Sequence, residues 1–163
     1  MKFKPLAIAD RPIFKELLTK YPPETSEMTF TNLFMWKNRY QPQWALEDGA
    51  LFIILKGGDE DYFALPPLGL NNGGELLKRF IGAMTRFSSK PKIARASKGF
   101  VENLPTPDEY EVIPDEDNND YVYLADDLIN LPGNKYHKKK NHINRFKKSY
   151  QHEYKTLDDD VIE

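Results

Sequence analysis

The 163-residue chain has no cysteine, no long apolar run and a net charge of only −2. The absence of cysteine excludes a disulfide framework, a thiolate zinc site and a thiol nucleophile, and it fits a reducing compartment. No apolar stretch approaches the ~20 residues of a membrane-spanning helix, and residues 1–5 do not begin a secretory signal. The sequence therefore predicts a cytoplasmic protein that has no transmembrane segment and that meets a membrane only at its periphery.

The composition supplies enough apolar material for a packed domain. Hydrophobic residues make up 40% of the chain and charged residues 29%, so the chain is too apolar to be disordered. Periods of 2 and 3.6 residues predict strands and helices in a definite order. The expected strands cover residues 3–6, 44–47, 51–56, 62–65, 92–96, 110–113 and 121–124, and the expected helices cover residues 10–21, 29–40, 75–87 and 98–104.

This order predicts an α/β fold with a mixed sheet over residues 1–125, in the arrangement of GNAT-type N-acyltransferase folds. Asp10 is the expected N-cap of the first helix. The dipeptide at residues 48–49, Asp-Gly, is typical of a tight hairpin turn. The helix over 75–87 is the most clearly amphipathic, and we expect Phe80, Ile81 and Met84 to be buried against the sheet.

Charge is distributed unevenly along the second half of the chain. Residues 99–134 contain ten acidic residues and no Lys or Arg, whereas residues 135–155 contain seven Lys, one Arg and a single Glu. Such asymmetry is typical of a chain with an anionic partner. The alternative is that the acidic and basic runs neutralise each other within the fold.

The basic run should form a helix over residues 136–150. At 100° per residue, one stripe of this helix is apolar and should dock it, and it consists of Tyr136, Ile143, Phe146 and Tyr150. Lys138, Asn141, Arg145 and Lys148 fall roughly opposite. Lys139 points among the apolar residues. Either its stem packs on apolar surface while its ammonium reaches water, or it faces a cleft and meets an anion there.

The same helix carries a dense array of hydrogen-bond donors suited to phosphate or carboxylate oxygens. The candidate substrate-binding residues are Lys138, Lys139, Lys140, Asn141, His142, Asn144 and Arg145. No catalytic residue, cofactor or metal site is predicted. His137 and His142 are five residues apart, so they do not share a helix face as a metal-binding pair would. The acidic segment 115–120 resembles the start of a calcium-binding loop, but Asp120 stands where such a loop requires Gly.

Four stretches of the chain resemble a bacterial family related to the C-terminal domain of phosphatidylglycerol lysyltransferase. They read TFTNLFMW (29–36), PPLG (66–69), DYVYLADDL (120–128) and KYHKKKNHINRFKK (135–148). The resemblance implies a tandem pair of GNAT-like lobes, as in the Fem peptidyltransferases, and transfer of an aminoacyl group from a transfer RNA to a lipid headgroup or a cell-wall peptide. Lys140 stands where the family usually has Arg, so one planar guanidinium is missing. Residues 66–69 are either a turn or a lining of the substrate site.

The last residues repeat the pattern of the first ones. An expected strand over 152–157 followed by acidic residues 158–160 matches the strand over 3–6 followed by Asp10. We therefore expect a GNAT-like lobe over residues 1–125, a linker with the basic helix over 126–151, and the start of a second lobe over 152–163 that continues beyond Glu163.

The leading hypothesis is the first lobe of an aminoacyltransferase- or acyltransferase-like protein. Its basic helix would bind an anionic substrate, either aminoacyl-tRNA or a phospholipid headgroup, while the chemistry would need the second lobe. This stretch alone is therefore expected to be inactive. No Gln/Arg-x-x-Gly-x-Gly loop is present, which argues against an ordinary acetyl-CoA enzyme. The alternative is a non-enzymatic module that binds RNA or anionic lipid through the same helix.

Overall fold

The computed structural model describes residues 1–58, 61–70, 73–119 and 121–155, and the chain divides into two compact units, Met1–Asn118 and Asn119–Glu163. The first unit contains a four-stranded antiparallel sheet of order β1-β2-β3-β4. The strands are β1 (Lys4–Pro5), β2 (Gln43–Glu47), β3 (Ala50–Lys56) and β4 (Tyr62–Ala64). The α/β class expected from the sequence is confirmed.

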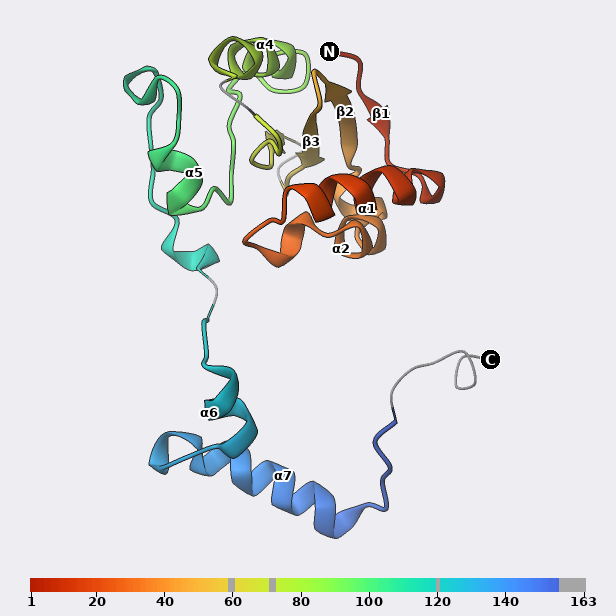
Figure 1. Cartoon of the computed structure of the whole chain (residues 1–163), viewed down its shortest axis with the longest axis vertical. Coiled ribbons are helices and arrows are strands. Elements are labelled where there is room, and N and C mark those ends of the chain that lie inside the picture. Colours follow the sequence, from red (N-terminus) through yellow and green to blue (C-terminus); the bar gives the residue numbers. More distant parts are fainter. Residues whose placement is uncertain (59–60, 71–72, 120, 156–163) are drawn as a thin grey trace. The chain divides into compact units, whose positions relative to one another are not determined.

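The described helices of the first unit are α1 (Arg11–Lys20), α2 (Phe30–Met35), α3 (Lys37–Tyr40), α4 (Gly74–Met84) and α5 (Lys98–Glu102). Short 3₁₀ turns cover Ile8–Asp10, Ser26–Met28, Pro107–Glu109 and Glu116–Asn118. The second unit contains α6 (Ala125–Asn130), a 3₁₀ turn (Asn134–Tyr136) and α7 (His137–Ser149). Figure 1 shows α1 and α2 together on one side of the strands and α4 on the other.

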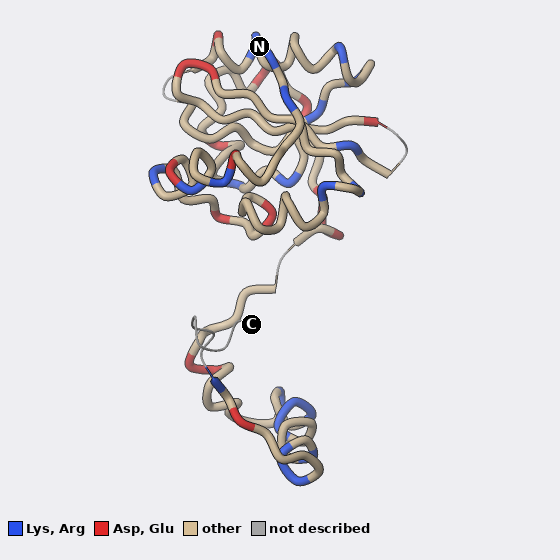
Figure 2. Tube along the Cα trace, turned by 90° about the vertical axis from the view of Figure 1, so that its right-hand side faces the viewer, with Lys and Arg blue, Asp and Glu red and all other residues tan. Residues whose placement is uncertain are grey.

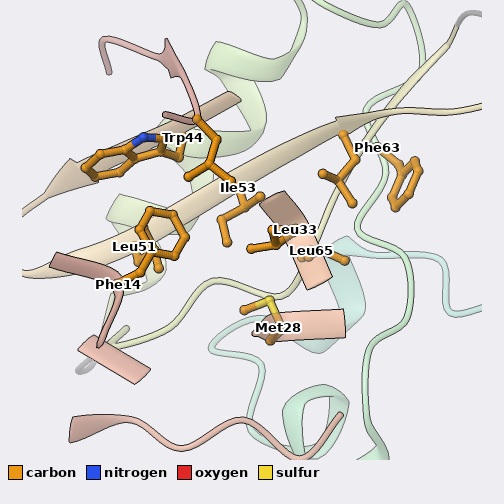
Figure 3. Packing of buried hydrophobic residues seen from close by; sticks show 10 residues of the cluster. Phe14, Met28, Leu33, Trp44, Leu51, Ile53, Phe63 and Leu65 are labelled. Carbon is orange, nitrogen blue, oxygen red and sulfur yellow. The ribbon is translucent and has the colours of Figure 1, made fainter. Parts of the chain in front are cut away.

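Strand β3 is the centre of the first unit because both of its faces are buried. Leu51, Ile53 and Leu55 belong to the cluster that also contains Phe14 of α1 and Leu33 of α2, part of which is seen in Figure 3. The intervening positions point to the other face of the sheet, as period-2 geometry requires. These are Ala50, Phe52 and Ile54, and they pack with Leu77, Phe80 and Met84 of α4.

Two local predictions are confirmed in detail. The hairpin between β2 and β3 has a two-residue loop, since Glu47 pairs with Ala50, and both loop residues have positive φ, 53° at Asp48 and 78° at Gly49. That combination is the backbone of a type I′ turn, whose twist suits a hairpin. On α4, Phe80 and Met84 are fully buried and Ile81 is partly buried against the sheet.

The helix expected over residues 29–40 is interrupted. Thr29 caps α2 by accepting a hydrogen bond from the Asn32 amide at 3.2 Å, but Trp36 leaves the helical region with φ −93° and ψ 11°. The chain then forms α3. This helix ends at Tyr40, and the next residue, Gln41, has a left-handed φ of 43°. One amphipathic run therefore forms two short helices.

Several expected strands are absent, and those predictions were wrong. Residues 110–113 and 121–124 alternate as strands do, but neither pairs with another strand among the described residues. Residues 152–155 are not a strand either, and residues 156–157 lie outside the described part. The segment at 92–96 forms only an isolated parallel bridge between Ile93 and Ala64. Alternation makes a strand possible, but a neighbouring edge must supply the hydrogen bonds.

Asp10 occupies the N-cap position of α1 as expected, but its carboxylate does not cap that helix and instead accepts hydrogen bonds from other elements. It is 5% exposed, and its carboxylate accepts hydrogen bonds from Lys4 Nζ at 2.8 Å, the Ala7 amide at 2.9 Å and Trp44 Nε1 at 3.0 Å. Burial alone would raise the pKa of Asp10, but these three donors outweigh it, so the pKa lies below its ordinary value of 3.8. The carboxylate thereby ties β1 and the start of α1 to β2.

Substitution of Asp10 tests how much its hydrogen-bonded carboxylate stabilises the first unit. We expect Asp10→Asn to lower the free energy of unfolding by about 2 kcal/mol at pH 7, because a charged acceptor of three hydrogen bonds, one of them buried, is lost. Since the folded pKa lies below the unfolded one, the difference from the wild type should shrink as the pH falls below about 4. Urea denaturation at pH 7 and pH 3 measures both effects. Asp108→Asn, at an exposed carboxylate, is the control and should change little.

A second prediction concerns the core under α4. Phe80 is fully buried, with its ring centroid 4.7 Å from that of Phe52. We expect Phe80→Ala to cost about 3–5 kcal/mol in urea denaturation because it leaves a cavity. Phe146→Ala removes the same side chain from a site that is 48% exposed and should cost no more than about 0.5 kcal/mol. Equal losses in the two variants would contradict the assignment of the core.

Candidate anion-binding site

The start of α7 is fixed by the helix that precedes it. Gly133 has φ 69° and ψ −173°, a conformation open essentially to glycine alone, and it allows the chain to turn from α6 into the 3₁₀ turn before α7. Tyr136 in that turn is 7% exposed. Its hydroxyl donates to Asp127 Oδ2 at 3.2 Å, and Lys135 Nζ donates to the same oxygen at 2.7 Å. Asp127 of α6 thus holds the start of the basic helix.

This contact shifts both ionisable partners in the expected directions. The hydrogen bond from Lys135 is the main reason that the pKa of Asp127 lies below its ordinary value of 3.8. The same hydrogen bond raises the pKa of Lys135 above 10.5. Both groups are therefore charged at neutral pH, and the pair is an exposed ion pair.

The Lys and Arg residues of α7 itself have no such partner among the described residues of their own unit. Every residue of α7 is exposed, including all of the candidate substrate-binding residues, which are Lys138, Lys139, Lys140, Asn141, His142, Asn144 and Arg145. Within residues 121–155, no carboxylate lies within 4.0 Å of a Lys or Arg of this helix. Figure 2 shows the Lys and Arg positions gathered along it. The described acidic residues of this unit therefore do not neutralise α7, and Asp127 pairs with Lys135 just before the helix.

The donor array is also partly ordered by the helix itself. Asn141 Nδ2 lies 3.4 Å from His137 Nδ1, one turn away, so these two side chains form a local pair. Lys139 is exposed, and the choice between a packed stem and a cleft-facing ammonium stays open. Such side chains can bind phosphate or carboxylate oxygens as point charges, while Arg145 can bind two oxygens at once.

Within its own unit, the apolar stripe of α7 is covered only at Tyr136 among the residues described. Tyr136 is buried, but Ile143, Phe146 and Tyr150 are 43%, 48% and 63% exposed. The ring of Phe146 lies beside rings close to it in sequence, with centroids 5.2 Å from Tyr150 and 5.0 Å from His152. The expected docking of the other three positions stays a prediction, because it needs a surface from outside residues 121–155.

A second exposed apolar segment precedes α6 and continues into it. Before the helix, Val122 and Leu124 are 93% and 72% exposed and Tyr121 and Tyr123 are also exposed; within α6, Leu128 and Ile129 are exposed. Soluble monomers rarely leave consecutive apolar residues in water without a function. The second unit therefore combines uncompensated positive charge with uncovered apolar side chains.

Residues 66–69 have a structural role and also border a groove. Leu68 exchanges two backbone hydrogen bonds with Leu51, of 2.9 and 3.1 Å. Pro67 lines a groove together with Leu70, Phe100 and Leu104. The segment is thus a turn that pairs with β3 at one residue and faces the groove at another, and a substrate-lining role stays a prediction.

A smaller cleft of the first unit has no local signal in the sequence. It is lined by Glu27, Arg95 and residues of α2 and α3. A run of apolar and polar residues gave no signal for it, because Glu27 and Arg95 are far apart in the chain. Among the described residues, no three His, Asp or Glu side chains cluster closely enough to hold a metal ion.

The fold is therefore an α/β domain whose antiparallel sheet lies between helices, followed by a basic helical unit. The chain belongs to the phosphatidylglycerol lysyltransferase C-terminal family, whose profile matches residues 18–163. This confirms the resemblance carried by the four stretches. No curated protein sequence matches the chain significantly. None of the described helices has both the length and the apolarity needed to cross a bilayer.

One solved structure is similar over nearly the whole chain. It is a conserved protein of unknown function from Bacteroides thetaiotaomicron VPI-5482, with 27% sequence identity and a TM-score of 0.76. The similarity covers 92% of this chain but 51% of that one. The chain therefore spans about half the length of that protein.

The hydrogen bond between Lys135 and Asp127 leads to a prediction about the pKa of Asp127. An NMR titration should find the pKa of Asp127 below its ordinary value of 3.8 in the wild type and closer to that value in Lys135→Gln, because the main hydrogen-bond donor is removed. Lys140→Gln removes the same charge from a side chain that does not contact Asp127, so the pKa of Asp127 should stay low. A low pKa that survives in Lys135→Gln would show that another group holds the carboxylate.

Proposed function

We propose that this chain is the first, GNAT-like part of an aminoacyltransferase- or acyltransferase-like protein and that α7 binds an anionic substrate. The substrate class is aminoacyl-tRNA or a phospholipid headgroup, as membership of the family suggests. The observation that carries the proposal is the set of exposed cations on α7 that no carboxylate of residues 121–155 neutralises. Uncompensated cations on one rigid helix attract phosphate groups and release counterions on binding.

The order of the elements supports the GNAT-like part of the proposal. A strand, the helices α1 to α3, three antiparallel strands and α4 follow in the order expected for such a lobe. The parallel bridge between Ala64 and Ile93 supports a mixed sheet, because a parallel neighbour lies beside β4.

The exposed apolar residues of the second unit support a second lobe. Val122, Leu124, Ile143 and Phe146 would be covered if further chain packed on the 119–155 segment. The solved protein from Bacteroides thetaiotaomicron is about twice as long as this chain, since the similarity covers 51% of it. In this proposal the second lobe follows Glu163 and completes the catalytic site, and the protein works in the cytoplasm, at the membrane surface when its substrate is lipid.

Salt dependence and paired substitutions test the role of α7. Binding of the 163-residue chain to transfer RNA, by fluorescence anisotropy, and to phosphatidylglycerol vesicles, by flotation, should weaken steeply with added salt. Lys138→Ala with Arg145→Ala should lower affinity at least about tenfold and reduce the slope of log K against log salt by roughly 2, one for each lost phosphate contact. The melting temperature should not change, because both side chains are exposed.

The matched control removes two exposed Lys side chains from the first unit. Lys90→Ala with Lys98→Ala makes the same change in net charge and should keep the affinity and the salt slope near those of the wild type. Binding that is insensitive to salt, or an equal loss in both double variants, would end the claim that α7 is the site. Preference for RNA over vesicles, or the reverse, decides between the two substrate classes.

A further inference from the structure

Lys135 differs from the cations of α7 because a carboxylate already neutralises it. It lies in the 3₁₀ turn Asn134–Tyr136, just before α7. Its Nζ donates to Asp127 Oδ2 at 2.7 Å and lies 4.8 Å from the ring centroid of Tyr136. A cation next to the proposed anion-binding helix is therefore paired with a side chain of α6.

Asp127 has two hydrogen-bond donors that differ in burial. The Tyr136 hydroxyl donates to the same Oδ2 at 3.2 Å, and Tyr136 is 7% exposed, whereas the Lys135 side chain is 64% exposed. The buried ring and its hydroxyl can hold the start of α7 by themselves, because neither depends on the ammonium. Lys135 can thus change its partner while the turn stays in place.

Breaking the contact between Lys135 and Asp127 should cost little. Water solvates an exposed ammonium well, so an ion pair of this kind contributes little to stability. A phosphate that replaces the carboxylate also releases counterions from its own strand, which favours binding further. The exchange is therefore feasible whenever a phosphate comes within reach of Lys135.

Lys135 continues a row of cations that runs along α7. At about 100° per residue, Lys135, Lys138 and Arg145 fall within about 80° of one another around the helix axis. The interval from Lys135 to Arg145 corresponds to roughly 15 Å at about 1.5 Å per residue. Such a row suits a chain of phosphates, as in an RNA strand, better than it suits a single small anion.

We propose that Lys135 is a further anion-binding residue of the α7 site and that Asp127 regulates it. In the free protein, Asp127 pairs with Lys135. When an RNA strand binds to α7, Lys135 leaves Asp127 and contacts a phosphate of the strand. This inference rests on the function proposed for α7.

The pairing with Asp127 gives the site a preference among anions. A small anion must displace a carboxylate that the fold holds beside Lys135. A strand already bound through Lys138 and Arg145 presents its next phosphate at a high effective concentration, so it displaces the same carboxylate more easily. Asp127 therefore selects a polymer of phosphates over isolated anions.

Substitution of Asp127 tests the regulation. Asp127→Asn keeps an oxygen that can accept from Tyr136 and removes the charge that competes for Lys135. Fluorescence anisotropy with transfer RNA should show at least about threefold tighter binding, because the competitor is gone. Asp126→Asn is the matched control, since it makes the same change in charge at a carboxylate that accepts from Asn130 Nδ2 at 2.8 Å. It should tighten binding by less than about 1.5-fold, because salt screens a charge that does not contact Lys135.

Substitution of Lys135 gives an independent test, also if Asp127→Asn does not fold. Lys135→Gln should weaken binding of transfer RNA at least about threefold and reduce the slope of log K against log salt by roughly 1, for one lost phosphate contact. In the Lys135→Gln background, Asp127→Asn should have no more effect than Asp126→Asn, because no ammonium is left to release.

The outcomes separate this inference from the function proposed for α7. Binding of transfer RNA that depends on Lys138 and Arg145 but is unchanged by Lys135→Gln and Asp127→Asn would overturn this inference alone. An equal gain in Asp127→Asn and Asp126→Asn would do the same, because the effect would then be one of net charge. If Asp127→Asn tightens binding to phosphatidylglycerol vesicles but not to transfer RNA, the choice of RNA is wrong. A chain that binds neither transfer RNA nor vesicles would overturn both proposals.

Discussion

Burial of β3 on both faces is the constraint on which the first unit depends. Its residues from Ala50 to Leu55 are all buried, so neither face of the sheet can be left to solvent. Different helices bury the two faces. Helices α1 and α2 pack on one face, and α4 packs on the other. The tight turn before β3 fixes its register with β2, and a slip by one residue would exchange the two clusters. The hydrogen bonds of Asp10 then attach β1 at the edge of this layered core.

The second unit is organised in a different way. Among its described residues, Tyr136 alone is buried, and contacts to Asp127 set where α7 begins. Apolar residues before α6 and along α7 are exposed and are not covered within this unit. This arrangement is consistent with a helix that lies between two parts of a longer protein, as we propose for this family member. The positive charge of α7 would then be concentrated where those parts meet a substrate.

The sequence by itself determined the elements whose signals are local. The Asp-Gly turn, the apolar face of α4, the apolar run of β3 and the extent of the basic helix α7 were all predictable, because turn conformation and periodicity depend on neighbouring residues. Only the tertiary structure decided which alternating segments pair as strands, since residues 110–113 and 121–124 find no neighbouring edge among the described residues. It also brought three hydrogen-bond donors to the carboxylate of Asp10, and it placed Glu27 within ion-pair distance of Arg95. Contacts between residues distant in sequence leave no local pattern, because they exist only after the chain has packed.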